Sequence, residues 1–453
     1  MTQTQAQTQT LTTGPIPTLL RKIAVPASVG FFFNTLFNAV DTWWGGQIST
    51  QALAALSLSF PVFFIIIAVG SGLASGTTAL IGTALGKGNL EEAETFSAQG
   101  ISFGILISIF LTAVGLAGSR TLFAFLGASG EYLRICLAYM NVIFAGSIFF
   151  IVNHMFSAIL NALGDTRPFR NFLIAGCLLN VLLDPWFIYG GFGVPPMSFA
   201  GIALATVLIQ AMGCLYLCSR VRRTKLGSAC DPDRLRPRLA AFREIARQGV
   251  PAAANFFTIG LGIFVITYFV SGFGKEAVAA YGAAMRIEQI ILLPAIGLST
   301  ATLAIVAQNS GARLFDRMDE TVRTALRYGG IIMLCGAVAL FLFAGPLMAV
   351  FTADPAVIAV GRTYLKISAF VLYAYVVLSV NVATLQGIRK PMFALWIGLW
   401  RQIVAPVALF WVLTRLLDFG LTGIWWGIFG INWSAAAVAW IYARRQMKKA
   451  ANA

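Results

Sequence analysis

Hydrophobic residues along this chain of 453 residues occur in long runs separated by short polar stretches. A helix needs about 20 mostly apolar residues to cross the hydrocarbon core of a bilayer. Twelve runs meet that length, and the spans that they predict begin near Ile23, Ala52, Phe96, Ile135, Asn171, Ser198, Val250, Val278, Thr324, Val357, Met392 and Leu421. The pattern predicts an all-α polytopic membrane protein with twelve transmembrane helices.

Composition and charge agree with a membrane protein. Hydrophobic residues make up 58% of the chain and charged residues only 11%, whereas a soluble domain has about 25% charged residues. With the amino terminus placed inside, 24 of the 32 basic residues fall on the cytoplasmic side and six on the opposite side. The positive-inside rule then places both termini in the cytoplasm. Basic residues scattered in this way do not form a nucleic-acid-binding surface.

The two halves of the chain repeat each other. Val25-Pro26-Ala27 matches Val250-Pro251-Ala252, which lies 225 residues later, and Gly72 matches Gly297 at the same spacing. Each half holds six spans, an even number, so both halves enter the membrane in the same direction. Parallel repeats of this kind occur in transporters that hold substrate between two helix bundles. The repeat therefore favours a carrier over a channel or a receptor.

This organisation predicts five segments. They are a disordered cytoplasmic tail at 1–20, a first lobe at 21–220, a basic cytoplasmic linker at 221–248, a second lobe at 249–443 and a basic cytoplasmic tail at 444–453. We interpret the linker as a solvated loop that sets the topology and touches anionic lipid head groups.

Side chains for enzyme chemistry are scarce. The chain has one histidine and six cysteines, and Cys214 and Cys218, which are one helical turn apart, have no histidine or acid beside them. These numbers disfavour a catalytic triad, a metal site and a disulfide framework. We expect neither an enzyme nor a protein that needs a metal or an organic cofactor.

Asp41 is an acid within the first predicted span, and the matching residue of the second half is Ile266. An ionised aspartate inside a membrane is costly and normally faces a cavity, a partner or an ion path. Asn34 and Asn38 precede it at helical spacing and share its face. We interpret Asp41 as a working residue of the first lobe; the alternative is a cap of an outer helix end.

A second acid, Asp184, follows Asn180 by one helical turn and precedes Pro185. The proline cannot donate a backbone hydrogen bond, which leaves carbonyl oxygen available beside the carboxylate. An acidic, oxygen-rich kink suits a proton or a hard monovalent cation. The alternative is a proline kink with a local cap.

Other polar residues of the spans have less defined roles. His154 either titrates during transport or is a neutral histidine held by a neighbouring helix, and both alternatives stay open. Ser157 and Asn161 continue its face, and Thr206 is a further polar candidate in the sixth span. The second half has three charged residues within its spans, Arg286, Glu288 and Arg401. We interpret them as a structural ion network in which Arg401 is the partner of Glu288.

Longer motifs point to one family. They are Ala279-Ala280 running to Arg286-Ile287-Glu288, Pro294-Ala-Ile-Gly297, Ala307-Gln-Asn-Ser-Gly-Ala-Arg313, Gly164-Asp-Thr-Arg-Pro168, Asn180 with Leu183-Asp184, Gly201 to Ala205-Thr206, and Leu385-Gln-Gly387 with Lys390-Pro391. Together they resemble the multidrug and toxin extrusion (MATE) transporters from about Pro17 to Ala443.

The resemblance implies two six-helix lobes arranged as a V, and export of cationic or amphipathic compounds against an inward flow of protons or sodium ions. In the branch similar to the DNA-damage-inducible F protein, the cation site lies in the first lobe. Its residues match Asp41, Asn180, Asp184 and Thr206, and Pro26 matches the proline at which the first helix is proposed to bend.

The chain also departs from some relatives. Thr258 and Tyr375 stand in the regions where a sodium-linked branch carries acids, which favours proton coupling. Phe37 and His154 replace a tyrosine and an asparagine of some first-lobe relatives. The hydrogen-bond network around the site, and the residues that line its cavity, must therefore differ.

Taken together, the sequence predicts a proton-coupled or sodium-coupled multidrug efflux antiporter. We expect it to be a monomer in a bacterial inner membrane, with small cationic or amphipathic substrates and no nucleic-acid partner. The alternative is a lipid-linked oligosaccharide flippase of the same superfamily, which would need cationic side chains facing its cavity.

Overall fold

The computed structural model describes residues 11–191 and 193–452, and these residues are almost entirely helical. Ten helices are long and apolar enough to cross a bilayer, and two bent pairs complete a set of twelve spans within this part of the chain. The bent pairs are α5 with α6, at 45°, and α12 with α13, at 51°. The prediction of a twelve-span all-α protein is confirmed.

The chain divides into two compact units, which contain residues 29–253 and residues 11–28 with 254–452. Unit 1 contains α3 (Thr50–Gly86), α4 (Leu90–Phe125), α5 (Gly130–Ala145), α6 (Ser147–Ala162), α7 (Arg167–Tyr189), α8 (Phe199–Arg222), η1 (Gly227–Cys230) and η2 (Pro232–Leu235). Unit 2 contains α10 (Lys275–Gly311), α11 (Phe315–Ala349), α12 (Pro355–Ser368), α13 (Leu372–Gly387), α14 (Met392–Leu399), η3 (Trp400–Val404), α15 (Ala405–Trp411), η4 (Val412–Leu416) and α16 (Gly420–Ala451).

Two helices belong partly to each unit. The division falls after Ser28 within α2 (Ile16–Ile48) and after Ala253 within α9 (Leu239–Ser271). Each point comes two residues after a buried proline, Pro26 or Pro251. A proline inside a helix removes one backbone hydrogen bond and weakens the helix at that place. The repeat seen in the sequence therefore extends to the positions where the chain passes from one unit to the other.

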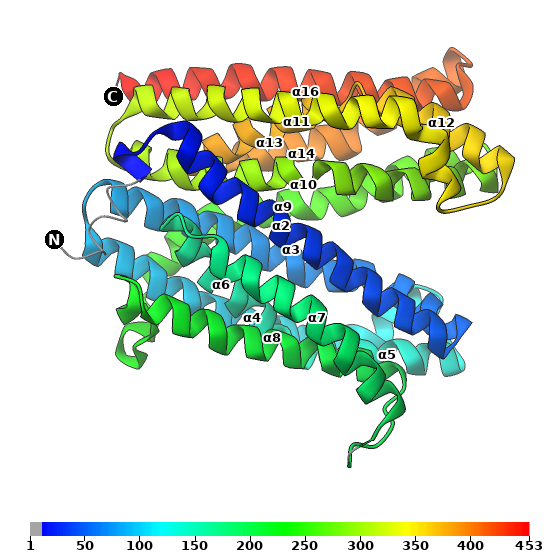
Figure 1. Ribbon diagram of the computed structural model, residues 1–453, viewed down its shortest axis with the longest axis horizontal. Coiled ribbons are helices and arrows are strands. Elements are labelled where there is room, and N and C mark those ends of the chain that lie inside the picture. Colours follow the sequence, from blue (N-terminus) through cyan, green and yellow to red (C-terminus); the bar gives the residue numbers. More distant parts are fainter. Residues whose placement is uncertain (1–10, 192, 453) are drawn as a thin grey trace. The chain divides into compact units, whose positions relative to one another are not determined.

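Packing inside each unit repeats in the same register. Gly72 of α3 lies directly against the backbone of Ala253, and Gly297 of α10 lies against Ser28. Any Cβ atom at either glycine would collide with the facing helix. Small residues allow such close approach between membrane helices. Elsewhere α7 packs on α8 in unit 1 and α13 packs on α16 in unit 2 (Figure 1).

The chain before α2 differs from the prediction of a disordered tail at 1–20. Residues 1–10 lie outside the described part of the chain, but from Leu11 onward the chain is ordered and packed. Asn309 donates to the carbonyl of Leu11 at 3.0 Å, and Arg317 donates to the carbonyl of Gly14 at 2.6 Å. Apolar side chains of the segment are buried in unit 2: Leu11, Ile16, Leu19 and Leu20. The prediction of disorder is wrong for residues 11–20, because their apolar side chains are buried in the hydrophobic core of unit 2.

The linker between the halves is also more ordered than predicted. Helix α8 ends at Arg222 and α9 begins at Leu239, so the helical part starts well before residue 249. The buried Gln99 of α4 donates to the carbonyls of Arg234 and Arg236 at 2.9 Å each and accepts from the backbone N–H of Arg238 at 2.7 Å. One buried amide thus satisfies three backbone groups of the linker, whereas Arg222, Arg223, Arg236 and Arg238 are exposed. The linker is therefore ordered, and its contact with lipid head groups stays a prediction.

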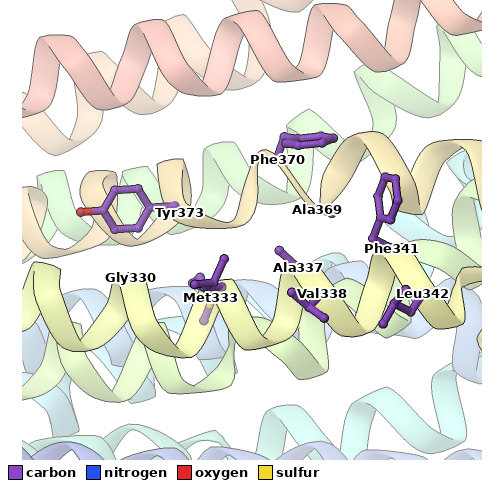
Figure 2. A pocket seen from close by; sticks show the side chains of 10 residues that line it. Gly330, Met333, Ala337, Val338, Phe341, Leu342, Ala369, Phe370 and Tyr373 are labelled. Carbon is purple, nitrogen blue, oxygen red and sulfur yellow. The ribbon is translucent and has the colours of Figure 1, made fainter.

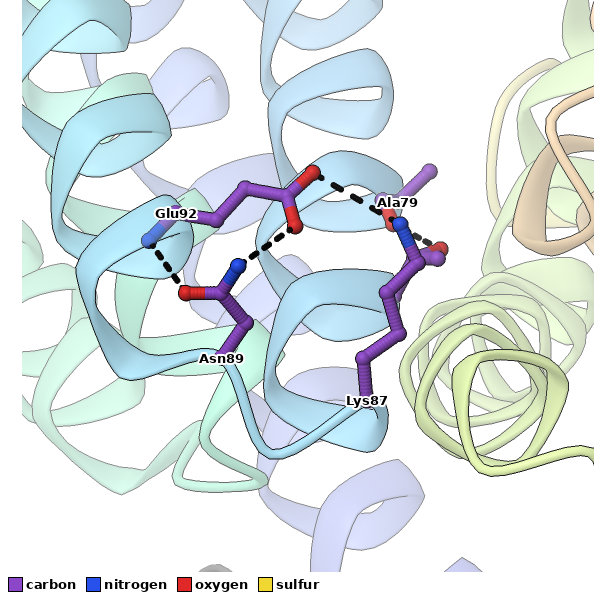
Figure 3. Close-up of polar contacts among 5 residues, drawn as sticks. Ala79, Lys87, Asn89 and Glu92 are labelled. Carbon is purple, nitrogen blue, oxygen red and sulfur yellow. Dashed lines mark hydrogen bonds and ion pairs between the residues drawn. The ribbon is translucent and has the colours of Figure 1, made fainter.

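The turn between α3 and α4 is held by a small polar cluster (Figure 3). Asn89 caps α4, since its Oδ1 accepts from the backbone N–H of Glu92 at 3.0 Å and its Nδ2 donates to the Glu92 carboxylate at 3.3 Å. The Lys87 ammonium lies 3.7 Å from the same carboxylate. Gly88 has φ +74°, a conformation that glycine adopts without strain. The cluster fixes the short connection through which α4 follows α3.

We predict that Gln99→Ala releases the linker from α4. The change removes three hydrogen bonds from buried groups, which should cost about 1–3 kcal/mol of stability. The expected result is a lower thermal unfolding midpoint in detergent and faster tryptic cleavage between α8 and α9. The exposed Gln51, changed to Ala, is the matched control and should alter neither. Equal cleavage rates for the two variants would contradict this role of Gln99.

Candidate functional site

Four predicted site residues lie together inside unit 1. Asp41 comes from the second half of α2, Asn180 and Asp184 from α7, and Thr206 from α8, and all four are buried. Close helix packing makes this possible: a Cβ at Gly30 of α2 would lie 3.3 Å from the backbone of Arg170 on α7. Three helices thus bring distant parts of the sequence to one place.

The amide of Asn180 bridges the two acids. Its Nδ2 donates to Asp41 Oδ1 at 2.9 Å and to Asp184 Oδ1 at 2.9 Å. An amide nitrogen has two protons, and both are used here. The spacing of Asn180 and Asp184 by one turn of α7 explains why a single amide reaches both its own helix neighbour and α2.

The oxygens on the other side of the site are less well satisfied. Thr206 has a single hydroxyl proton, and its oxygen lies 3.0 Å from the carbonyl of Ile202 but 3.4 Å from Asp41 Oδ2. The shorter contact takes the proton, so the bond to Asp41 is weak. Within the described residues, Asp184 Oδ2 and Asn180 Oδ1 have no hydrogen-bond partner. Three buried oxygens therefore remain available for a further group.

No basic side chain balances the acids. The described residues contain no ion pair that involves Asp41 or Asp184. Two neighbouring carboxylates in a low-dielectric site repel each other, and an unpaired buried charge costs several kcal/mol. Chemically, the arrangement can bind a proton or a small monovalent cation.

Tyr139 of α5 is a residue of this site that the sequence did not indicate. It is buried, stacks on Phe199 with ring centroids 5.0 Å apart, and lies near enough to interact electrostatically with Asp41 and Asp184. The chain has eleven tyrosines, and nothing in the spacing of this one sets it apart. Only the packing of α5 against α8 reveals it.

The predicted neighbours of Asp41 on α2 do not join the hydrogen-bonded site. Asn38 donates to the backbone carbonyl of Asn34 at 3.0 Å, a bond within the helix. Phe37 is buried in the apolar core of unit 1, with its ring toward Gly176 of α7. Within the described residues neither side chain is hydrogen-bonded to the acids, and a role of these residues in the substrate cavity stays a prediction.

The predicted group on α6 lies apart from the acids. His154 packs on the ring of Phe169 at 6.2 Å and fills the space opposite Gly70, where a Cβ would lie 2.6 Å from the imidazole. Asn161 donates to Ser157 at 3.4 Å. In the described chain no hydrogen bond connects these three residues to Asp41 or Asp184. Pro26, the predicted hinge, lies within a continuous α2, and its role stays a prediction.

Hydroxyl and amide groups bind the two buried charged residues of the predicted ion network in unit 2, Glu288 and Arg401. Glu288 accepts from Tyr364 at 2.7 Å and Ser368 at 2.8 Å, whereas Arg401 donates to Asn432 at 2.9 Å. Tyr375 lies between them: its ring faces the Arg401 guanidinium at 5.7 Å, and it interacts with Glu288. Glu288 and Arg401 also attract each other electrostatically, although no direct ion pair joins them among the described residues. Their role as a structural ion network stays a prediction.

Arg286 is the third member of the predicted network, and it is exposed. It lies two residues before Glu288 on α10 and therefore points to the other side of the helix. Among the described residues it makes no ion pair with Glu288.

The chain matches one protein family over most of its length. The family model MatE matches residues 26–186 and again residues 251–411, two stretches separated by the same 225 residues as the internal repeat. The two matches together cover more than half of the chain. Each begins at one of the two prolines, Pro26 and Pro251, near the division of α2 and α9.

Individual proteins are similar over nearly the whole length. The chain is 28% identical to a probable multidrug resistance protein NorM of Thermotoga maritima, covering 90% of this chain and 88% of the relative. It is 27% identical to an FAD transporter of Shewanella oneidensis, covering 88% of each. A structure described as the outward-facing conformation of a multidrug resistance MATE family transporter superposes with a TM-score of 0.91, at 25% identity and 98% coverage of both chains. The chain belongs to the MatE family of membrane transporters and is a transport protein rather than an enzyme.

Proposed function

We propose that this protein is a secondary active multidrug efflux antiporter that exports cationic or amphipathic compounds in exchange for protons. The observation that carries the proposal is the pair of buried acids, Asp41 and Asp184, bridged by Asn180 with no basic partner among the described residues. A site of this kind has a net negative charge that must be neutralised, and either a proton or a cation does so. Exchange between these two occupants is antiport.

The proton is the coupling ion that we propose, with sodium as the alternative. A proton shared between two carboxyl groups neutralises the site without further ligands, whereas a sodium ion requires several oxygens at fixed positions. The open oxygens are Asp184 Oδ2, Asn180 Oδ1 and the weakly bound Asp41 Oδ2. They lie on two helices, α2 and α7, so that occupancy of the site also governs how firmly α2 is held.

The proposed cycle uses α2 as its moving part. Protonation from the outside removes the charge of the acids, α2 bends near Pro26, and the substrate leaves outward. Loss of the proton to the cytoplasm restores the charge and the affinity for a cationic substrate. Protonation and bending would involve a single helix, because Asp41 and Pro26 both lie on α2. Termini in the cytoplasm of a bacterial inner membrane and a monomeric state belong to the same proposal.

The proposed substrate class follows from the negative charge of the site. Relatives carry the names multidrug resistance protein and multidrug export protein, which supports export of varied amphipathic compounds. The FAD transporter shows that an anionic compound is within the reach of the family. Two unpaired acids favour a cation here. No relative reported above supports the oligosaccharide flippase that we considered from the sequence.

We predict that Asp41→Asn abolishes coupled transport. The asparagine cannot release a proton, so uptake of ethidium into inverted proteoliposomes with an acidic interior should fall at least tenfold. The exposed Asp418, at φ +48°, offers a control, because asparagine tolerates this conformation as well as aspartate. Asp418→Asn should transport like wild type.

The same vesicles separate the alternatives. A sodium gradient at equal pH should drive little uptake by the wild type, and FAD should not compete with ethidium. Full transport by Asp41→Asn would contradict the role of this acid. Uptake driven by sodium alone would show that sodium rather than the proton is the coupling ion. Uptake of FAD would show that the substrates include anionic compounds.

We predict a structural role for Glu288 and its partners. Glu288→Gln keeps an acceptor oxygen for only one of the two hydroxyls, Tyr364 or Ser368, and loses the charge-assisted bonds, which should lower stability by about 1–3 kcal/mol. The expected result is a lower unfolding midpoint with an unchanged dependence of transport on the pH gradient. A variant that is stable but uncoupled would instead make Glu288 a second coupling residue.

A further inference from the structure

An apolar groove lies on unit 2 between α11 and the bent pair of α12 and α13 (Figure 2). Its volume is about 690 Å³, within the range of sites that hold small organic ligands. Gly330 and Tyr373 line one end, Phe341 and Leu342 line the other, and Phe370 lies between the two ends. The Tyr373 hydroxyl is the only side-chain polar atom among its lining residues. The groove thus suits a hydrocarbon chain.

The bend between α12 and α13 creates the groove. The two helices meet at 51°, and the break exposes the carbonyl of Phe370, to which the Trp433 indole donates at 3.0 Å. Gly330 allows the Tyr373 ring to approach α11, since a Cβ there would lie 3.3 Å from the ring. The buried Met333 and Ala369 form the floor. Specific contacts on both sides therefore hold the groove open.

The length of the groove matches one leaflet. Its lining residues on α11 run from Gly330 to Leu342, which corresponds to about 18 Å at 1.5 Å per residue. Half of the hydrocarbon core of a bilayer is roughly 15 Å thick. An acyl chain of one leaflet would therefore occupy the groove along most of its length.

Positive charge lies at one end only. Lys366 of α12 places its ammonium 5.1 Å from the centroid of the Phe341 ring, which itself contacts the Phe370 ring at 6.3 Å. Arg362, one turn earlier on α12, is exposed on the same helix face. Within the described residues neither side chain takes part in an ion pair. These two cations stand where the head group of a lipid in the groove would lie.

We propose that this groove binds a phospholipid with an anionic head group. One acyl chain lies along α11 between Gly330 and Phe341, and Lys366 with Arg362 holds the negatively charged head group. The transported compounds do not fit this description, since a cationic substrate would be repelled by the same two residues. A zwitterionic lipid would fill the groove but would gain less from the charges.

The lipid would stabilise the part of unit 2 that holds Glu288. The carboxylate is bound by Tyr364 and Ser368, and Ser368 directly precedes the groove residue Ala369. A ligand that binds only the folded state raises stability in proportion to the logarithm of its concentration. Anionic lipid should therefore raise the unfolding midpoint of the protein, independently of any transport activity.

The test measures lipid retention by the full chain, purified and delipidated in dodecyl maltoside. Native mass spectrometry and thermal unfolding compare dioleoylphosphatidylglycerol with dioleoylphosphatidylcholine. We expect the anionic lipid to be retained at least tenfold more strongly and to raise the unfolding midpoint more. The double variant Arg362→Gln with Lys366→Gln should lose this preference but should still bind either lipid weakly.

Two further variants keep the test decisive. Lys275→Gln with Arg415→Gln removes the same charge from exposed positions of unit 2 outside the groove and should retain the preference. Ala337→Phe fills the groove and should reduce retention of both lipids. Equal retention of the two lipids by the wild type would overturn the proposal. So would an unchanged preference in the Arg362 and Lys366 double variant, or an equal loss in its charge-matched control.

Discussion

Burial of Asp41 and Asp184 in a span-forming region, without a basic partner among the described residues, is the constraint on which the rest of this protein depends. A bilayer offers no water to a buried carboxylate, so the protein must supply hydrogen bonds or the site must take up a positive charge. Asn180 donates one hydrogen bond to each acid, and its amide nitrogen then has no further proton to donate. The remaining charge makes the site responsive to protons or cations, and a structural ion pair would not be.

The two halves of the repeat use buried acid in opposite ways. In unit 1 the acids share one amide and leave oxygens without partners. In unit 2 Glu288 accepts hydrogen bonds from Tyr364 and Ser368, and the nearby Arg401 donates to Asn432. The same pattern of helix contacts, visible in the pairs Gly72 with Ala253 and Gly297 with Ser28, thus carries two unpaired acids in one half and an acid with a nearby arginine in the other.

Much of this could be predicted from the sequence, because the strongest signals are local. Apolar runs predicted the spans, the 225-residue spacing predicted the repeat, and Asn180 with Asp184 share one turn of one helix. Contacts between helices were not predictable. Tyr139 lies near the acids only through helix packing, Gln99 binds a linker more than 130 residues away in sequence, and Arg401 donates to Asn432. In each case the partner residue depends on how separate helices pack together, which the spacing of residues along the sequence does not specify.

In the proposed cycle a proton and a cationic substrate compete for the charge of Asp41 and Asp184. Calorimetry of ethidium binding to the purified protein, repeated in two buffers of different ionisation enthalpy, counts the protons exchanged on binding. We expect about one proton to be released per substrate bound near neutral pH, by linkage between the two equilibria, and we expect Asp41→Asn to reduce this number. Binding of ethidium by the wild type without proton release at any pH would contradict the account.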